Sequence, residues 1–239
     1  MKSVNTKFRS SEAEIMDKFD FNGEKLENTL KDLERVNRFL GGNKVTLNGL
    51  EKFILKGKEV VHIADIGCGS GQTLREIAKW GRKRNLKLQL IGIDANPYTI
   101  EIAEKLSMDF PEISYQTQDI FNGKFPEYQY DIVCICLTLH HFSTEKIKEL
   151  LLKLSRNTDL GIIINDLQRS RVAYYLFQLF CLVFVRSKIA KKDGLISILR
   201  GFKRTELKAI SEELQFKKIK ITWCWAFRYQ WIIKMSHNN

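Results

Sequence analysis

The chain has 239 residues and a formal net charge of +11; 44% of its residues are hydrophobic, only three are proline, and no repeat or low-complexity tract occurs. This composition predicts one α/β domain with an extension, globular apart from the first ten or so residues and the last few. Five scattered cysteines exclude a disulfide framework, and the lack of a basic region followed by an apolar run at the N-terminus predicts a cytoplasmic protein.

An amphipathic helix is predicted before the core. Between Glu24 and Leu40, leucine and valine recur every three or four residues, which is the spacing of one helix face. Gly41 and Gly42 follow and predict the end of this helix. We therefore expect residues 1–57 to form a helical extension that caps the domain of residues 58–239.

The centre of the chain alternates between strand and helix patterns. Strands are expected at residues 60–66, 88–93, 113–117, 131–137 and 160–165, and helices at 71–82, 97–109 and 144–155. Such alternation predicts a parallel sheet with right-handed crossovers. A helix at 205–214 and two strands at 216–223 and 226–234 close the chain.

The last third of the chain carries the whole net charge and an apolar insertion. Residues 1–150 contain 22 basic and 22 acidic side chains, whereas residues 151–239 contain 17 and 6. This excess favours an anionic substrate, peripheral contact with an anionic membrane, or an ordinary solvated surface. Within an insertion at about 168–203, the segment Val172–Val185 is almost wholly apolar and too short to span a bilayer. It is predicted to be a lid over an apolar pocket, an interfacial helix or a buried core helix.

A glycine-rich turn follows the first predicted strand. Asp65 ends that strand, and Gly67, Gly69 and Gly71 follow in the pattern G-x-G-x-G. Such a turn lets the backbone approach a ligand at the carboxyl edge of a parallel sheet. Asp94 stands 23 residues after Gly71 and ends the second strand, where an acid can receive ribose hydroxyls.

These motifs, with Gln118-Asp119-Ile120 and the loop Leu139-His140-His141 after the fourth strand, resemble the class I S-adenosylmethionine (SAM) methyltransferases over residues 58–166. The resemblance implies a Rossmann-like, doubly wound, seven-stranded sheet with one antiparallel strand from the closing hairpin. It implies that Asp65 receives the ammonium group of SAM and that an acid or amide near Asp119 meets the adenine amino group. The implied cofactor contacts are Asp65, Gly67, Cys68, Gly69, Gly71, Asp94, Ala95, Asn96, Asp119, Ile120 and Leu137. An N-terminal helix often covers the cofactor in these enzymes, so Asn37 and Arg38 become candidate ligand contacts.

Two narrower resemblances concern the methyl acceptor. The Leu-His-His loop resembles enzymes of the ubiquinone and menaquinone biosynthesis type. Other segments resemble a bacterial subgroup often associated with polyketide-derived phenols or pyrones: Asn37-Arg38 before Gly41-Gly42, Asn165 to Ser170, and Asp193-Gly194 with Ser197, Arg200 and Phe202.

Methyl transfer from SAM mainly requires that nucleophile, methyl group and sulfur be aligned and that water be excluded. A phenol or enol acceptor also benefits from a general base, for which His140 and His141 are the candidates. Asn165 and Asp166 resemble half of the magnesium site of catechol-type O-methyltransferases. Residues 136–138 supply no acid for the other half, so we predict no metal. Asp166 is instead expected to orient the substrate or nearby arginines, and Asp166, Arg169, Tyr174 and Arg200 are the candidate substrate contacts.

The sequence thus predicts a SAM-dependent methyltransferase acting on a hydrophobic small molecule, by O-methylation of a polyketide-like or quinol-type phenol. C-methylation of a quinone precursor remains an alternative. The basic composition allows an RNA methyltransferase, but the Asn/Asp-Pro-Pro-aromatic signature and the Pro-Cys pair are missing, which disfavours nucleic acid. A SAM-binding, membrane-associated partner without activity is the non-enzymatic alternative.

Overall fold

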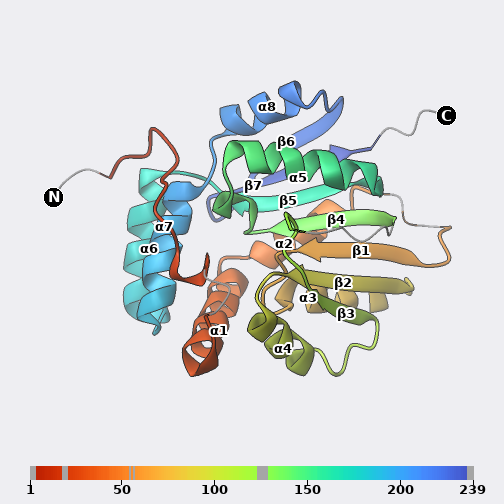
Figure 1. Cartoon of the computed structure of the whole chain (residues 1–239), viewed down its shortest axis with the longest axis horizontal. Coiled ribbons are helices and arrows are strands. Elements are labelled where there is room, and N and C mark those ends of the chain that lie inside the picture. Colours follow the sequence, from red (N-terminus) through yellow and green to blue (C-terminus); the bar gives the residue numbers. More distant parts are fainter. Residues whose placement is uncertain (1–3, 18–20, 54, 56, 123–128, 236–239) are drawn as a thin grey trace.

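The computed structural model describes residues 4–17, 21–53, 55, 57–122 and 129–235. Its centre is a seven-stranded sheet in the order β3-β2-β1-β4-β5-β7-β6 (Figure 1). The strands are β1 Val61–Ile66, β2 Leu88–Asp94, β3 Ile113–Thr117, β4 Tyr130–Cys136, β5 Thr158–Leu167, β6 Lys218–Cys224 and β7 Arg228–Lys234. Only β7 runs antiparallel to its neighbours β5 and β6. The predicted Rossmann-like, doubly wound sheet is therefore confirmed.

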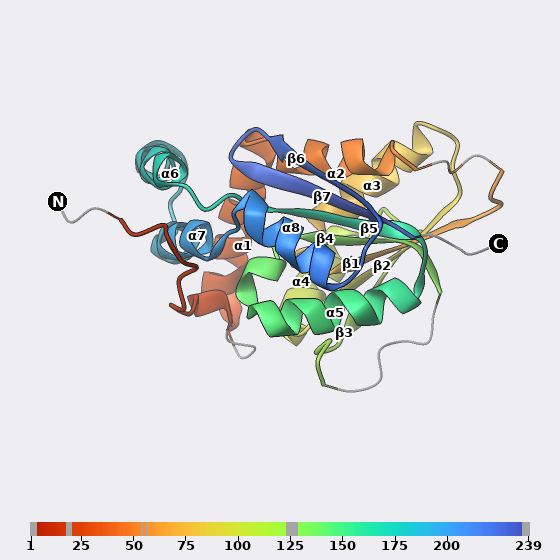
Figure 2. The same cartoon turned by 90° about the horizontal axis from the view of Figure 1, so that it is seen from above.

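Helices cover both faces of the sheet (Figure 2). The helices α5 Thr144–Arg156 and α8 Arg204–Glu213 pack on one face, and α3 Gln72–Arg82 and α4 Pro97–Leu106 contribute to the core on the other. Because both faces are covered, the central strand β4 is an apolar run that is buried along nearly its whole length. The predicted elements agree with the structure to within three residues at each end.

The N-terminal part is more ordered than its sequence predicts. The helix α1 Gly23–Phe39 is followed by Gly41, whose φ of 69° is left-handed. A second helix, α2 Gly42–Leu50, begins directly after it. Gly49 brings α2 so close to β5 that a Cβ there would lie 2.8 Å from the Ile163 side chain.

The expectation that the first ten residues lie outside the globular part is wrong for Val4 to Ser10. Arg9 donates hydrogen bonds to the carbonyl oxygens of Arg200 (2.8 Å), His140 (3.0 Å) and Phe142 (2.8 Å), and the Ser10 N–H donates to Leu199. These bonds fix the segment across the carboxyl ends of the strands. The similar expectation for the last few residues concerns 236–239, which lie outside the described residues.

The insertion after β5 consists of two helices, α6 Arg171–Phe184 and α7 Lys188–Arg200. Ser170 and Ser187 begin them by accepting hydrogen bonds from the N–H groups of Ala173 and Ala190. Only Ala173 and Cys181 of α6 are buried, so α6 is not a core helix. Among the described residues, no helix is both long enough and apolar enough to cross a membrane.

Candidate functional site

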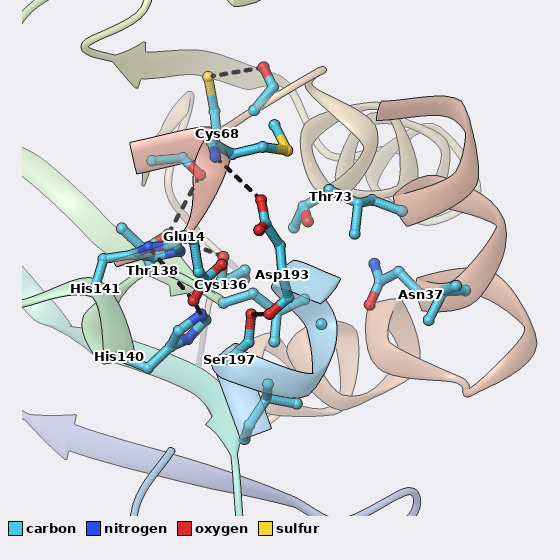
Figure 3. A pocket seen from close by; sticks show the side chains of 18 of the residues that line it. Glu14, Asn37, Cys68, Thr73, Cys136, Thr138, His140, His141, Asp193 and Ser197 are labelled. Carbon is cyan, nitrogen blue, oxygen red and sulfur yellow. Dashed lines mark hydrogen bonds and ion pairs between the residues drawn. The ribbon is translucent and has the colours of Figure 1, made fainter. Parts of the chain in front are cut away.

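A cavity of about 820 Å³ opens at the carboxyl ends of the parallel strands. This volume lies toward the upper end of the range that ligand sites occupy, about 300–1,000 Å³. Its walls come from the glycine turn, the ends of β2 and β4, α1, α6, α7 and the turn between β6 and β7. In Figure 3 the Glu14 side chain lies between the two histidines on one side and Asp193 and Ser197 of α7 on the other.

The glycine turn has the backbone conformation that its sequence predicts. Gly67, Gly69 and Gly71 have φ values of 69°, 53° and 76°, which favour glycine strongly over other residues. Space also requires glycine at position 67, because a Cβ there would lie 2.4 Å from the Thr138 side chain. The turn is tied to β2, since the Gly69 N–H donates to Oδ2 of Asp94 at 3.0 Å.

Two buried carboxyl groups lie beside this turn. Asp94 lines the cavity, and burial raises its pKa although the N–H groups of Asn96 and Gly69 oppose the shift. Asp65 does not line the cavity; its Oδ1 is buried without a hydrogen-bond partner, and burial together with Asp94 raises its pKa to about 8. Two such groups favour a cationic ligand, because a positive charge would relieve both shifts.

Most of the residues predicted to contact the cofactor lie together in the wall of the cavity. The cavity wall includes Gly67, Cys68, Gly69, Asp94, Ala95, Asn96, Asp119, Ile120 and Leu137, but neither Asp65 nor Gly71. Leu137 has a φ of 54°, a strained conformation for leucine that turns the chain at the end of β4. Asn37 lines the cavity, whereas Arg38 does not.

Each histidine is held by a carboxylate. Nδ1 of His140 lies 2.7 Å from Oδ1 of Asp166, and Nδ1 of His141 lies 2.6 Å from Oδ1 of Asp17. Both rings line the cavity, although His140 is only 3% exposed. A carboxylate acceptor at Nδ1 favours the tautomer in which Nδ1 carries the proton and Nε2 is free to accept one.

The environment keeps both carboxylates ionised. Burial acts to raise the pKa of Asp166, but the charge of His140 and hydrogen bonds from His140 and Leu167 outweigh it and lower the pKa. At Asp17, burial is again opposed and outweighed by hydrogen bonds from His141 and Arg200, so its pKa also falls. Both therefore remain negatively charged partners for an imidazolium.

Glu14 and Asp17 are functional candidates that the sequence analysis missed. They lie on a short segment that includes a 3₁₀ turn at Ile15–Asp17, which Asp193 anchors by accepting the N–H groups of Ile15 (3.0 Å) and Met16 (3.1 Å). Burial raises the pKa of Glu14 from 4.5 to about 7, against the lowering charges of His141 and Arg200. No periodicity or glycine marks this segment, so the single sequence gave no signal for it.

None of the four predicted substrate contacts lines the cavity, and each makes other contacts within the chain. Asp166 orients His140 rather than an arginine or a substrate. Arg169 is buried in an ion pair with Glu206 (2.5 Å) and donates to the Gly201 carbonyl. Arg200 donates to the carbonyl oxygens of His140 and His141 and so fixes the histidine loop. Tyr174 packs against Tyr175.

Instead, apolar side chains make up the wall away from the glycine turn. They come from α1 and its C-terminal end, the loop after β3, α6, the histidine loop and the β6–β7 turn: Leu33, Leu40, Phe121, Phe142, Leu176, Phe177, Phe180, Trp225 and Phe227. A site of this composition favours a ligand with a large apolar surface.

The described residues include one group that could hold a metal ion, Glu14 with His140 and His141, whose nearest ligand atoms all lie within 4.8 Å of one another. Its carboxylate comes from the N-terminal segment rather than from β4, where the sequence analysis looked. Nη1 of Arg200 already lies 3.6 Å from Oε1 of Glu14, and its positive charge opposes a second cation. Metal independence stays a prediction.

Comparisons with known proteins agree with this geometry. Residues 63–161 match the family model described as "Methyltransferase domain". The chain is 36% identical over 75 residues to an uncharacterized methyltransferase of Emericella nidulans, covering 31% of this chain and 24% of that one. It is 32% identical over 84 residues to malonyl-[acyl-carrier protein] O-methyltransferase 1 of Ilyobacter polytropus, covering 35% and 30%. The matched part thus spans less than a third of either relative.

Solved structures extend the likeness to nearly the whole fold. The plantazolicin methyltransferase BpumL in complex with SAH superimposes with a TM-score of 0.64 at 22% identity, covering 88% of this chain and 89% of that one. Human N-acetylserotonin methyltransferase in complex with SAM gives 0.65 at 17% identity, covering 92% and 58%. At these identities the likeness concerns the fold alone.

Proposed function

We propose that this chain, whose residues 63–161 form a class I SAM-dependent methyltransferase domain, methylates a hydrophobic small molecule at the oxygen of a phenol or enol. The observation that carries this proposal is the His140–Asp166 pair, whose histidine lines the same cavity as the glycine turn. One wall of that cavity is suited to SAM and another to an apolar acceptor.

The residues of the first wall fit SAM. The glycine turn leaves room for the methionine part next to backbone groups, and the raised pKa values of Asp65 and Asp94 fit a cationic ligand. Asp94 at the end of β2 would accept the ribose hydroxyls, and Asp119 with Ile120 would meet the adenine. SAM supplies a methyl group that its sulfonium has already activated, so the protein need not generate a strong electrophile.

The residues of the chain then supply alignment and proton transfer. With Nδ1 bonded to Asp166, His140 can take the proton of an acceptor hydroxyl at Nε2 as the oxygen attacks the methyl group. Asp166 stabilises the resulting imidazolium and keeps the ring oriented. His141 and Asp17 form a second, more exposed pair that is the alternative base. The apolar wall excludes water, which favours reaction at the bound acceptor.

The acceptor class rests on the shape and composition of that wall. Aromatic side chains of α6 and of the β6–β7 turn suit a polyketide-like or quinol-type phenol. C-methylation of an enolised ring would use the same base. The name of the Ilyobacter relative refers to O-methylation, which supports oxygen as the acceptor atom.

The test measures SAM binding by calorimetry and then methyl transfer from labelled SAM to polyketide-like phenols, quinols and RNA. We expect micromolar or tighter SAM binding and transfer to phenols that falls strongly in His140→Asn. Salt-dependent transfer to RNA without transfer to phenols would favour the nucleic-acid alternative. SAM binding without transfer to any acceptor would favour the non-enzymatic one.

A further inference from the structure

The face of α6 that points away from the protein is an uninterrupted apolar stripe, which we call the α6 stripe. It consists of Val172, Tyr175, Leu179, Leu182, Val183 and Phe184, all exposed, with Leu182 and Val183 each 74% exposed. Steps of three or four residues place most of these side chains along one side of the helix. Phe39 of α1 extends the stripe, because its ring lies 5.6 Å from that of Phe184.

The place of α6 in the fold leaves this stripe open to solvent. Figure 2 shows α6 end-on at the outer edge of the molecule, with α7 beside it. The opposite face of α6 supplies Ala173, Phe177 and Phe180 to the wall of the cavity. A single helix therefore separates the cavity from the outside, and both of its faces are apolar.

Basic residues outnumber acidic ones in the segment that carries the stripe. Residues 171–192 contain five basic side chains and no aspartate or glutamate: Arg171, Arg186, Lys188, Lys191 and Lys192. The next acid, Asp193, is buried and accepts backbone N–H groups of the N-terminal segment. Of the five basic residues, Lys192 lies 3.8 Å from Glu12, and the N–H groups of Arg186 and its neighbour Ser187 donate to the buried Asp32. An apolar helix face bordered by an excess of cations is typical of helices that lie in the interface of an anionic membrane.

The same charges argue against a second copy of the chain as the partner. A two-fold interface would bring the same patch of both copies together, so that the excess positive charges of the two copies would approach one another. Anionic headgroups would neutralise these charges, while the acyl region would cover the apolar side chains. Fourteen helical residues span about 21 Å, which is shorter than the roughly 30 Å hydrocarbon core, so the helix must lie along the surface.

We propose that α6 docks this protein onto anionic lipid bilayers, with the α6 stripe inserted below the headgroups and the flanking arginines and lysines on the lipid phosphates. This docking needs neither SAM nor methyl transfer, so the experiment that tests it is independent of the proposed function. If both hold, apolar acceptors can reach the cavity past α6 without crossing bulk water.

The test is co-sedimentation of the full chain with vesicles of phosphatidylcholine alone and of equal parts phosphatidylcholine and phosphatidylglycerol. We expect binding to the anionic vesicles that weakens as salt is added. The variant Leu179→Ser/Val183→Ser should bind more than tenfold more weakly, and Arg186→Gln/Lys188→Gln should lose the preference for anionic vesicles. Neither variant changes a residue of the cavity wall, so SAM binding by calorimetry should be retained and reports correct folding.

The matched control is Met108→Ser/Leu152→Ser, which removes two exposed apolar side chains elsewhere on the surface and should bind vesicles like the unchanged protein. Three results would overturn the proposal. One is that the unchanged protein does not bind anionic vesicles. Another is that Leu179→Ser/Val183→Ser binds them as strongly as the unchanged protein. The third is that the unchanged protein sediments as a dimer and does not bind vesicles, whereas Leu179→Ser/Val183→Ser sediments as a monomer. That result would make a second copy of the chain the partner.

Discussion

Replacing Asp166 by Asn tests the pair on which the proposed chemistry depends. The substitution keeps the shape of the side chain but removes the negative charge 2.7 Å from Nδ1 of His140. Hydrogen bonds to charged groups contribute about 1.5–3 kcal/mol, and both partners are nearly fully buried. Since 1.36 kcal/mol corresponds to a tenfold change in rate, the loss of this bond to the imidazolium should lower kcat about 10- to 150-fold.

The assay is steady-state methyl transfer from labelled SAM to a phenolic acceptor, with SAM affinity measured by calorimetry on the same preparation. Asp166 does not line the cavity, so SAM affinity should be nearly unchanged. The comparison variant is Asp17→Asn, which removes the equivalent partner of His141. A larger loss in Asp17→Asn than in Asp166→Asn would make His141 the base. Unchanged kcat in Asp166→Asn, or an effect on KM alone, would refute the reasoning.

Three further predictions concern the cofactor wall, the buried glutamate and the metal. Asp94→Ala should lower SAM affinity at least about 100-fold in calorimetry, because two hydrogen bonds to a charged group are lost; equal affinity would remove Asp94 from the site. Because the pKa of Glu14 is about 7 in the folded protein and about 4.5 in the unfolded chain, its contribution to stability is present below pH 4.5 and lost as the pH rises toward 7. At pH 8, Glu14→Gln should therefore raise the free energy of unfolding by up to about 3 kcal/mol relative to the unchanged protein. Thermal unfolding measures this as a higher melting temperature, and the gain should be smaller at pH 5. A gain that does not depend on pH would contradict this origin. Dialysis against EDTA should leave methyl transfer unchanged, since Arg200 already lies beside Glu14; a loss that a divalent cation restores would establish a metal site.

Local patterns were sufficient for the sheet and for the glycine turn. The central strands are short apolar runs that end in turns, and a parallel sheet covered on both faces buries such runs completely. The G-x-G-x-G turn requires left-handed backbone at each glycine, which other residues adopt only at a cost. The alternation of these elements allows few topologies. For this reason most of the residues predicted to contact the cofactor could be placed at the carboxyl edge of the sheet in advance, and their role as cofactor contacts stays a prediction.

The acceptor side could not be predicted in the same way. Arginines at a sheet edge bind either ligands or their own chain, and local sequence does not distinguish the two. Arg169 and Arg200 bind their own chain, because Glu206, Asp17 and several backbone carbonyls surround them. The apolar segment 172–185 was equally ambiguous, since the same side chains suit a core, a lid or an interface. Its position at the outer edge of the fold excludes the core.

The sequence by itself determined the sheet and the glycine turn, because each depends on interactions between residues close in the chain or on a regular alternation. Only the tertiary structure decided what surrounds the histidines. Asp17 reaches His141 across 124 positions, and Asp166 reaches His140 across 26. Contacts over such separations form when the packed core brings distant segments together, and no local pattern records them. The chemistry proposed for this cavity depends on those contacts.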